Sequence, residues 1–258
     1  MKKFFALLLA LLMTATLLCA CGEPKNDVEY VKEKGKLVVG ITEFKPMDWE
    51  ENDEWIGFDA DMAKAFADYL GVDAEFIEIN WNNKAMELET KAIDVVWNGM
   101  TITDEVKGLM GVSEAYCKNA QVVVVKKDIA DTIKTVDDIK TLKFTVENGS
   151  AGADALDAEN ISYTKADTQA TALLEVVSGA ADACVIDLLM AGAMIGEGTD
   201  YPTLAISVSL TSEEYGVGFR KNSELIAEFN KFWKEAYDAG TVMDKATQYG
   251  IAQNIIEK

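Results

Sequence analysis

The residues best placed to bind a ligand lie at the carboxyl ends of three predicted strands. They are Thr42, Glu43 and Phe44 after the first strand, Asn98, Gly99 and Thr101 at the second, and Asp187 at the third. In open α/β sheets, small ligands bind beyond the carboxyl ends of the strands. A buried carboxylate such as Asp187 could bind a cation there, because charge-assisted hydrogen bonds are strong in a medium of low dielectric constant. Alternatively, Asp187 could act as the N-cap of a following helix, a position that aspartate favours.

Two short polar segments could bind an anion or approach a ligand through their backbone. Gly149-Ser150-Ala151 opens a predicted helix, and amide groups at the start of a helix suit a carboxylate. Ser150 could instead act only as the N-cap of that helix. Gly99 would let the backbone come close to a ligand, although an Asn-Gly pair such as Asn98-Gly99 also forms ordinary turns.

The composition excludes several classes of function. The chain has 258 residues and a formal net charge of −20, whereas nucleic-acid binding requires a basic surface. This charge would favour the approach of cations and repel anions. The chain has no histidine, which removes histidine-based acid–base catalysis, Ser-His-Asp triads and histidine-containing metal sites. We therefore expect no nucleic-acid partner, no metal ion and no cofactor.

The N-terminal segment predicts secretion and lipid attachment. Two lysines precede the apolar run Phe4–Leu18, which is typical of a signal peptide and is short for a membrane span. The order Leu18-Cys19-Ala20-Cys21 resembles a bacterial lipobox, in which Cys21 becomes the lipidated N-terminus. We expect a signal peptide over residues 1–20 and a lipid-anchored tether over residues 21–35. The protein would then lie outside the cytoplasm, held at the cell membrane by palmitate-type acyl chains.

Two cysteines remain beyond the lipobox. Cys117 and Cys184 are far apart in the sequence and do not have the spacing of a metal site. They could pair as a disulfide bond outside the cell or lie buried as free thiols, and we favour free thiols.

Strands and helices alternate along the rest of the chain, and these elements must position the candidate residues. Apolar and β-branched runs predict strands, and apolar residues at i, i+3, i+4 and i+7 predict helices that end at glycine. The expected strands cover residues 36–41, 74–79, 94–97, 121–125, 142–146, 183–186 and 217–219. The expected helices cover residues 63–70, 84–92, 170–177 and 225–236. This alternation favours an α/β fold with largely parallel sheets covered by helices.

Five segments carry a resemblance to a known family through their order and spacing. They are Gly35–Gly40, Ile56–Asp61, Ile93–Thr103, Ala181–Asp187 and Tyr215–Lys221. Behind a lipobox, they resemble the extracytoplasmic solute-binding lipoproteins of ABC importers, in the polar amino-acid-binding family. The resemblance implies a two-lobed, periplasmic-binding-protein-like type II fold, with a hinge and a ligand cleft between the lobes.

The resemblance also implies how the chain divides and what it binds. Lobe 1 would comprise residues 36–115 and 216–258, lobe 2 residues 120–210, and the hinge residues 116–119 and 211–215. The expected function is to bind a small extracellular solute, in first place an amino acid, and to deliver it to an ABC transporter permease. We expect a monomer whose partners are this solute, the permease and the membrane, and which is not an enzyme.

The same resemblance assigns roles to the candidate residues. In the family that this chain resembles, the acid at the position of Asp187 pairs with the α-ammonium group of the ligand. The positions that match backbone and hydroxyl contacts to the ligand are Asn98, Gly99 and Thr101. Phe44 and Trp81 match aromatic residues that enclose the ligand side chain, although aromatic residues also form ordinary cores. Glu43 and Glu147 add acids to the same predicted pocket.

The sequence departs from the family at one position. After Thr101-Ile102-Thr103, relatives usually carry an arginine that binds the α-carboxylate of the ligand with two hydrogen bonds, whereas this chain has Val106. In a first explanation, the carboxylate is held by amides at Ser150 and Ala151, with help from Lys84.

In a second explanation, the ligand has no free α-carboxylate. A cationic amine between Phe44 and Trp81, facing Asp187 and Glu147, would be held by ionic and cation–π attraction. An alternative of another class is an enzyme of dehydratase type on the same fold, with Glu43, Glu147 and Asp187 as acids and bases. Turnover of a bound ligand would distinguish this enzyme from a binding protein.

Overall fold

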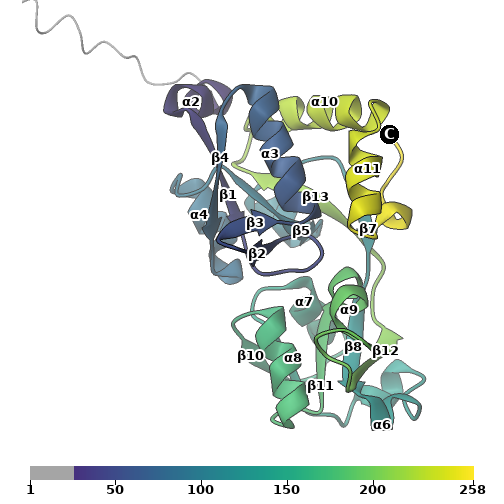
Figure 1. The fold of residues 1–258 in the computed structure, drawn as a ribbon. Coiled ribbons are helices and arrows are strands. Elements are labelled where there is room, and N and C mark those ends of the chain that lie inside the picture. The colour runs from purple at the N-terminus through teal and green to yellow at the C-terminus, as the bar shows by residue number, and fades with distance from the viewer. Residues whose placement is uncertain (1–25) are drawn as a thin grey trace, which may run out of the picture.

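The computed structural model describes residues 26–258 and arranges them in two α/β lobes (Figure 1). Each lobe contains a mixed β-sheet, which confirms the predicted two-lobed fold. The predicted signal peptide over residues 1–20 and the lipidation site Cys21 lie outside the described residues. None of the helices within residues 26–258 has the length and apolar character needed to cross a membrane.

The first lobe is built on a six-stranded sheet. Its strands are β1 (Lys36–Ile41), β4 (Asp73–Glu78), β5 (Val95–Thr101), β6 (Gly111–Val112), β7 (Cys117–Asn119) and β13 (Glu213–Phe219). The strand order is β4-β1-β5-β13-β6, with β7 also paired to β13. Strands β4 and β5 run parallel to β1, while β13 runs antiparallel to β5. Strand β1 has the bounds that the sequence predicts.

Helices cover both faces of this sheet. They are α2 (Asp27–Lys34), α3 (Phe58–Leu70), α4 (Lys84–Glu89), α5 (Asp104–Leu109), α10 (Leu225–Asp238) and α11 (Thr241–Gln248). On one face, Val39 packs in a cluster with Trp97 and Phe229, whose ring centroids are 4.9 Å apart. On the other face, Val38 packs in a cluster with Leu88. Burial on both faces explains why the strands are apolar without alternation.

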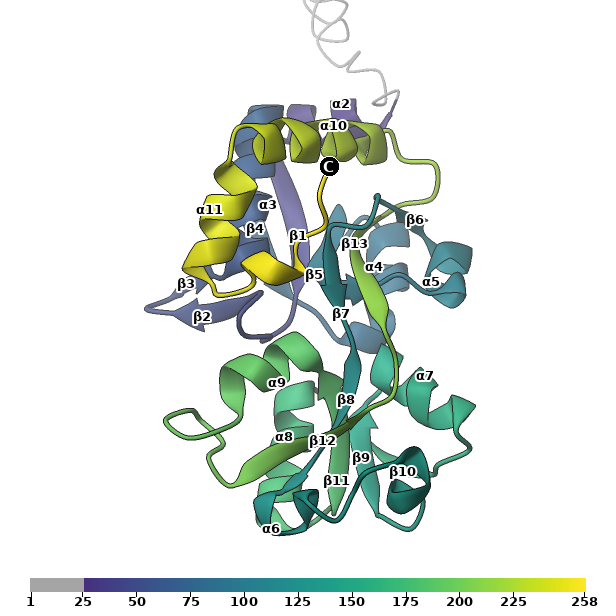
Figure 2. The same ribbon diagram turned by 90° about the vertical axis from the view of Figure 1, so that its right-hand side faces the viewer.

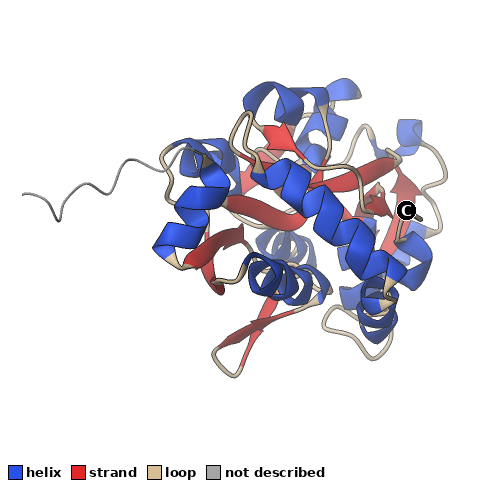
Figure 3. Ribbon diagram, turned by 90° about the horizontal axis from the view of Figure 1, so that it is seen from above, coloured by secondary structure: helices blue, strands red, loops and turns tan. Residues whose placement is uncertain are grey.

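The second lobe is built on a five-stranded sheet with the order β10-β9-β11-β8-β12. Its strands are β8 (Gln121–Lys126), β9 (Phe144–Glu147), β10 (Tyr163–Ala166), β11 (Ala183–Asp187) and β12 (Leu204–Ser209). Strands β9, β10 and β11 are parallel, and β8 is antiparallel to β11 and β12. The helices of this lobe are α6 (Lys127–Ala130), α7 (Ala151–Ala158), α8 (Gln169–Ser178) and α9 (Leu188–Met194). Seen from above, the helices flank the strands of the sheets (Figure 3).

Short elements that the sequence analysis did not predict complete the fold. Strands β2 (Trp49–Glu51) and β3 (Glu54–Ile56) form a separate hairpin. Single turns of 3-10 helix are η2 (Trp81–Asn83), η3 (Val136–Ile139) and η4 (Ala252–Asn254). Strands β10 and β12 and helix α11 were also not predicted. Strand β12 is only partly buried, so its sequence lacks the continuous apolar run of a central strand.

The chain passes twice between the lobes (Figure 2). In the first crossing, β7 ends at Asn119 in the first sheet and β8 begins at Gln121 in the second. In the second crossing, β12 ends at Ser209 and β13 begins at Glu213. Both connections are short and lie within or beside the predicted hinge segments.

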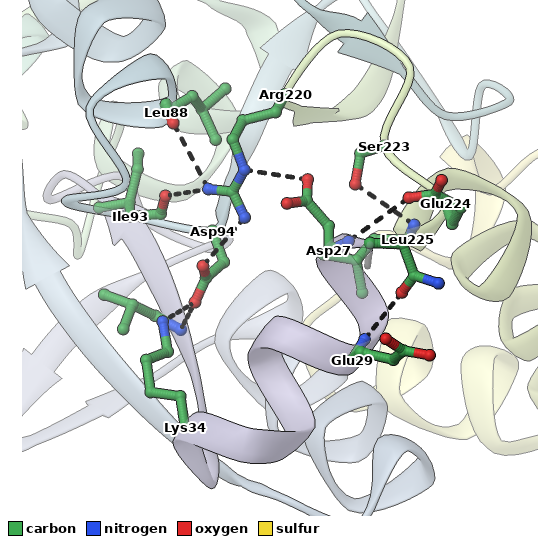
Figure 4. Close-up of polar contacts among 12 residues, drawn as sticks. Asp27, Glu29, Lys34, Leu88, Ile93, Asp94, Arg220, Ser223, Glu224 and Leu225 are labelled. Atoms are coloured by element: carbon green, nitrogen blue, oxygen red, sulfur yellow. Dashed lines mark hydrogen bonds and ion pairs between the residues drawn. The ribbon is translucent and has the colours of Figure 1, made fainter. Parts of the chain in front are cut away.

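Residues 27–34, predicted to be part of the tether, instead form helix α2 on the first lobe (Figure 4). Arg220 Nε donates a hydrogen bond to Asp27 Oδ2 at 2.9 Å, which fixes the start of the helix. Near its end, Lys34 forms an ion pair with Asp94, which also accepts from Arg220 Nη2 at 3.2 Å. The charged sequence that suggested a solvated tether therefore supplies the ion pairs that hold α2 in place.

Candidate functional site

A cavity of about 100 Å³ lies between the lobes, at the strand ends that the sequence analysis identified. The first lobe contributes Thr42, Trp81, Lys84, Asn98, Gly99, Met100, Thr101, Thr103, Glu105, Val106 and Leu109. The second lobe contributes Glu147, Gly149, Ser150, Ala151, Asp154, Gln169 and Asp187. The predicted site residues found among them are Trp81, Asn98, Gly99, Thr101, Glu147, Ser150, Ala151 and Asp187.

Two other predicted site residues, Glu43 and Phe44, do not line the cavity. Glu43 is exposed and accepts a hydrogen bond from the Glu50 amide at 3.4 Å. Phe44 is buried, and its ring packs behind Gly99 and edge-on against Tyr215, with ring centroids 6.3 Å apart. In this structure Phe44 therefore does not form the predicted pair of rings with Trp81, because its ring fills the space that Gly99 leaves without a side chain.

The substitution Gly99→Ala is expected to lower the free energy of unfolding by at least about 2 kcal/mol. Gly99 has a φ of 56°, in the left-handed region, and a Cβ atom there would overlap the Phe44 ring. Urea unfolding measures the change. The control is Gly108→Ala in helix α5, where a Cβ atom meets nothing within 4 Å and alanine is the better helix former. Equal stability of the two variants would contradict this account of Gly99.

Asp187 ends strand β11, and donors from both lobes hold its carboxylate. Its Oδ1 accepts hydrogen bonds from the Tyr215 hydroxyl at 2.6 Å and from the side-chain amides of Asn119 and Gln121 at 2.5 and 3.0 Å. Its Oδ2 accepts from Gln169 Nε2 at 2.6 Å. Although Asp187 occupies the N-cap position of α9, its side chain makes no capping hydrogen bond. The capping alternative is therefore wrong, and the carboxylate faces the cavity.

Glu213, which the sequence analysis missed, shares these donors with Asp187. Its Oε1 accepts from the same amide groups of Asn119 and Gln121, at 2.7 and 2.8 Å. It also accepts from the Thr101 hydroxyl at 2.9 Å. Burial raises the pKa of Asp187 to about 7, and the charge of Glu213 contributes to the shift. An acid inside a predicted hinge segment is the sequence signal that could have identified Glu213.

Asn98 and Gly99 form one wall of the cavity, but their amides are engaged within the protein. The Thr42 amide donates to Asn98 Oδ1 at 2.6 Å, and Asn98 Nδ2 donates to Thr42 Oγ1 at 2.9 Å. The Gly99 amide donates to Asp59 Oδ2 at 2.7 Å, which also accepts from the Tyr116 hydroxyl at 2.7 Å. Burial raises the pKa of Asp59 to about 7, and the hydrogen bonds from Tyr116 and Gly99 oppose this shift. These residues therefore shape the wall more than they offer donors to a ligand.

Lys84 connects the two lobes from within the cavity. Its Nζ donates to the Trp81 carbonyl at 3.3 Å and to the Gly149 carbonyl of the second lobe at 3.1 Å. The same atom lies 4.7 Å from the centroid of the Trp81 ring, a cation–π contact. Burial lowers the pKa of Lys84, and the charge of Glu147 opposes this shift. Burial raises the pKa of Glu147 to about 8, helped by the charge of Asp187 and opposed by Lys84.

Two helices begin at the cavity, one in each lobe. Ser150 caps α7, because its Oγ accepts from the Ala153 amide at 3.3 Å, which confirms the capping alternative for this residue. The Ala151 amide in the first turn has no acceptor within the helix and lines the cavity. In the first lobe, Thr103 caps α5 by accepting from the Val106 amide at 3.0 Å. Val106 is 8% exposed, and its side chain lines the cavity.

Neither a metal-binding cluster nor a disulfide bond is found among the described residues. Within residues 26–258, no three His, Cys, Asp or Glu side chains are grouped in a way that could hold a metal ion. Cys117 in β7 and Cys184 in β11 are buried free thiols, as the sequence analysis favoured. What the cavity offers is carboxylates, one ammonium group, an indole ring and a helix start, which suits binding more than metal chemistry.

The sequence matches the bacterial extracellular solute-binding proteins, family 3, over residues 37–251. The arginine-binding extracellular protein ArtP of Bacillus subtilis (strain 168) is 32% identical over 247 residues, which cover 93% of this chain and 94% of ArtP. A crystal structure of a mutant of ArgBP from T. maritima has a TM-score of 0.81 and 32% identity, and covers 87% of this chain and 99% of that one. The crystal structure of the ancestral amino acid-binding protein AncCDT-1, a precursor of cyclohexadienyl dehydratase, has a TM-score of 0.78 and 31% identity. The match covers 86% of this chain and 98% of AncCDT-1. The chain therefore belongs to family 3 of the bacterial extracellular solute-binding proteins, the class that serves ABC importers.

Proposed function

We propose that the protein binds a small solute of the amino-acid class in the cavity between its lobes and delivers it to the permease of an ABC importer. The observation that carries this proposal is the buried carboxylate of Asp187, which lines the cavity and is held by groups from both lobes. An ammonium group of the solute would pair with Asp187, close to Glu147, and its apolar part would contact Trp81. ArtP is an arginine-binding protein and ArgBP has been solved with arginine bound, which supports a ligand with such a group.

Delivery would depend on closure of the two lobes around the solute. The second lobe, residues 120–210, would turn on the first by bending within residues 116–119 and 211–215. The protein would be a monomer outside the cytoplasm, freed of its signal peptide and attached to the membrane by a lipid on Cys21. Capture and release without chemical conversion is the proposed activity, and mass spectrometry of a solute after prolonged incubation would reveal any turnover.

A thermal-shift screen tests the binding of a solute. The purified protein is unfolded and refolded to strip any bound solute, then mixed with the common amino acids, polyamines, quaternary amines and short peptides. A solute present at 100 times its Kd adds about 2.7 kcal/mol to the free energy of unfolding. At least one member of the panel should raise the melting temperature, and a panel without any shift would reject the proposed function.

The affinity for an ammonium-bearing solute is expected to rise about tenfold or more between pH 6 and pH 8. Burial raises the pKa of Glu147 to about 8 and that of Asp187 to about 7, so both carboxyl groups are largely protonated at pH 6. The cation binds their ionised forms, so binding releases protons and strengthens as the pH rises through this range. The groups that face these carboxyls are Lys84, Asn119, Gln121, Gln169, Glu213 and Tyr215. Calorimetry in buffers of different ionisation enthalpy measures the released protons, and no release would contradict the pairing.

A further inference from the structure

The charges that line the cavity are unbalanced. Among the described residues around it, Glu105, Glu147, Asp154 and Asp187 carry carboxyl groups, and Lys84 carries the one ammonium group. Glu147 and Asp187 are 4% and 5% exposed, while Glu105 and Asp154 are exposed at the rim on opposite lobes. At pH 8, where Asp187 is largely ionised and Glu147 is partly ionised, a carboxylate that entered this space would meet like charges both at the rim and beside these two buried groups. The cavity therefore disfavours an anionic group.

Lys84 does not correct this imbalance for a solute. Two of its three N–H donors are engaged by the Trp81 and Gly149 carbonyls. The charges of Glu147, Asp154 and Glu105 all act on its ammonium group. At pH 8 the ammonium group of Lys84 therefore offsets part of the negative charge of these acids, and only one of its N–H donors is left for a carboxylate of the solute.

The hydrogen-bond donors around the cavity are largely occupied as well. The engaged donors are the Gly99 amide with Asp59, Asn98 Nδ2 with Thr42, the Thr101 hydroxyl with Glu213, Gln169 Nε2 with Asp187, and the Ser150 hydroxyl with the Glu147 carbonyl. The Ala151 amide at the start of α7 is one donor that remains. A carboxylate needs several donors or a guanidinium group to replace its hydration. A cation needs only acceptors, which the carboxyl groups of the cavity supply.

The geometry points to a small organic cation without a free carboxylate as the solute of this site, its ammonium group paired with Asp187 and Glu147. This inference rests on the proposed function, because it concerns the same cavity and the same Asp187 carboxylate. The alkyl part of such a solute would contact the Trp81 ring, one face of which Lys84 Nζ already covers at 4.7 Å from the centroid.

Matched pairs of an amino acid and its decarboxylated amine test the inference. The pairs are arginine with agmatine, histidine with histamine, and ornithine with putrescine, together with any solute found by the thermal-shift screen and its carboxylate-free counterpart. Titration calorimetry at pH 8 measures the affinities of the stripped protein. In at least one pair, the amine should bind about tenfold more tightly than the amino acid. Argininamide, which keeps the bulk of arginine without its negative charge, should follow agmatine.

The outcomes separate the inference from the proposed function. If the amino acid binds as tightly as its amine or more tightly in every pair that binds, the inference is overturned and the proposed function stands. If neither the pairs nor the screen yields a bound solute, the proposed function fails and the inference fails with it.

The substitution Val106→Arg provides a second test of the charge balance. Val106 lines the cavity, and an arginine there would add a guanidinium group that can bind a carboxylate. The variant should shift the preference toward the amino acid by about tenfold relative to its amine. Val106→Gln, which adds length without charge, should not raise the affinity for the amino acid. Asp154→Lys places the charge at the exposed rim and should shift the preference in the same direction. A preference that neither cationic variant changes would overturn the inference.

Discussion

Replacing Asp187 by asparagine is expected to weaken solute binding between about 10- and 150-fold at pH 8. The substitution keeps the size of the side chain and removes the negative charge that would pair with an ammonium group. Calorimetric titration of the variant and the unaltered protein measures the loss. Binding within about twofold of the original affinity would show that the solute does not contact this carboxylate.

The matched control for this experiment is Asp182→Asn. Asp182 lies just before the other end of strand β11 and accepts a hydrogen bond from the Lys143 amide at 2.9 Å, far from the cavity. The Asp182→Asn substitution should leave the affinity for the solute unchanged. The two variants therefore separate an effect on the site from a general effect of removing an acid from this strand.

The same substitution at Asp187 is expected to change how stability depends on pH. Burial raises the pKa of Asp187 to about 7, above its value in the unfolded chain, so the native state retains a proton that the unfolded state releases. The contribution of Asp187 to the free energy of unfolding therefore falls as the pH rises from about 4 to about 7. Asp187→Asn should flatten this part of the profile, as measured by urea unfolding at several pH values. An unchanged slope would contradict the raised pKa.

The substitution Arg220→Met is expected to lower the free energy of unfolding by about 3 kcal/mol or more. The guanidinium group pairs with Asp27 at 2.9 Å and with Asp94 at 3.2 Å, and it donates to the Ile93 carbonyl at 2.8 Å (Figure 4). Asp94 is fully buried, so removal of Arg220 leaves its charge with one ion pair, to Lys34, and with the Val38 amide that donates to Oδ2 at 2.9 Å. Urea unfolding at pH 7 measures the loss.

An exposed ion pair serves as the control for Arg220. Lys234 and Asp238 are four residues apart on helix α10, and their side chains are 61% and 57% exposed. Lys234→Met should therefore cost no more than about 0.5 kcal/mol. If Arg220→Met cost as little, the network around Asp94 would not hold helix α2 on the first lobe.

The central elements of the fold were predictable from the sequence because they are buried on both faces. The apolar run at residues 36–41 could only be a strand between helices, and the structure has β1 with the same bounds. Helix α2 was missed for the opposite reason. In α2 only Val31 is buried, and the helix is held by Arg220, which lies nearly 200 residues away in the sequence. No local pattern reveals such a partner.

The candidate site was predictable where a side chain ends a strand, and less so where packing decides its direction. Asp187 was found because parallel strands present their carboxyl ends to one edge of the sheet. Glu213 was missed because its contact with the site depends on the antiparallel pairing of β13, which the sequence does not specify. The ring of Phe44 packs behind Gly99 in this structure, and an aromatic residue in such a place has the same local sequence as one that faces a ligand.

With the proposed lipid on Cys21, the contacts of helix α2 would decide which lobe stays fixed relative to the membrane. Six residue steps separate the proposed lipid on Cys21 from Asp27, a reach of at most about 22 Å. Because α2 is bonded to the first lobe through Asp27 and Lys34, that lobe would be the one attached to the bilayer. Among the described residues, the second lobe has no comparable contact with helix α2. Closure around a solute would then be a swing of the second lobe over a stationary first lobe, and the side on which the cavity opens would stay constant with respect to the membrane.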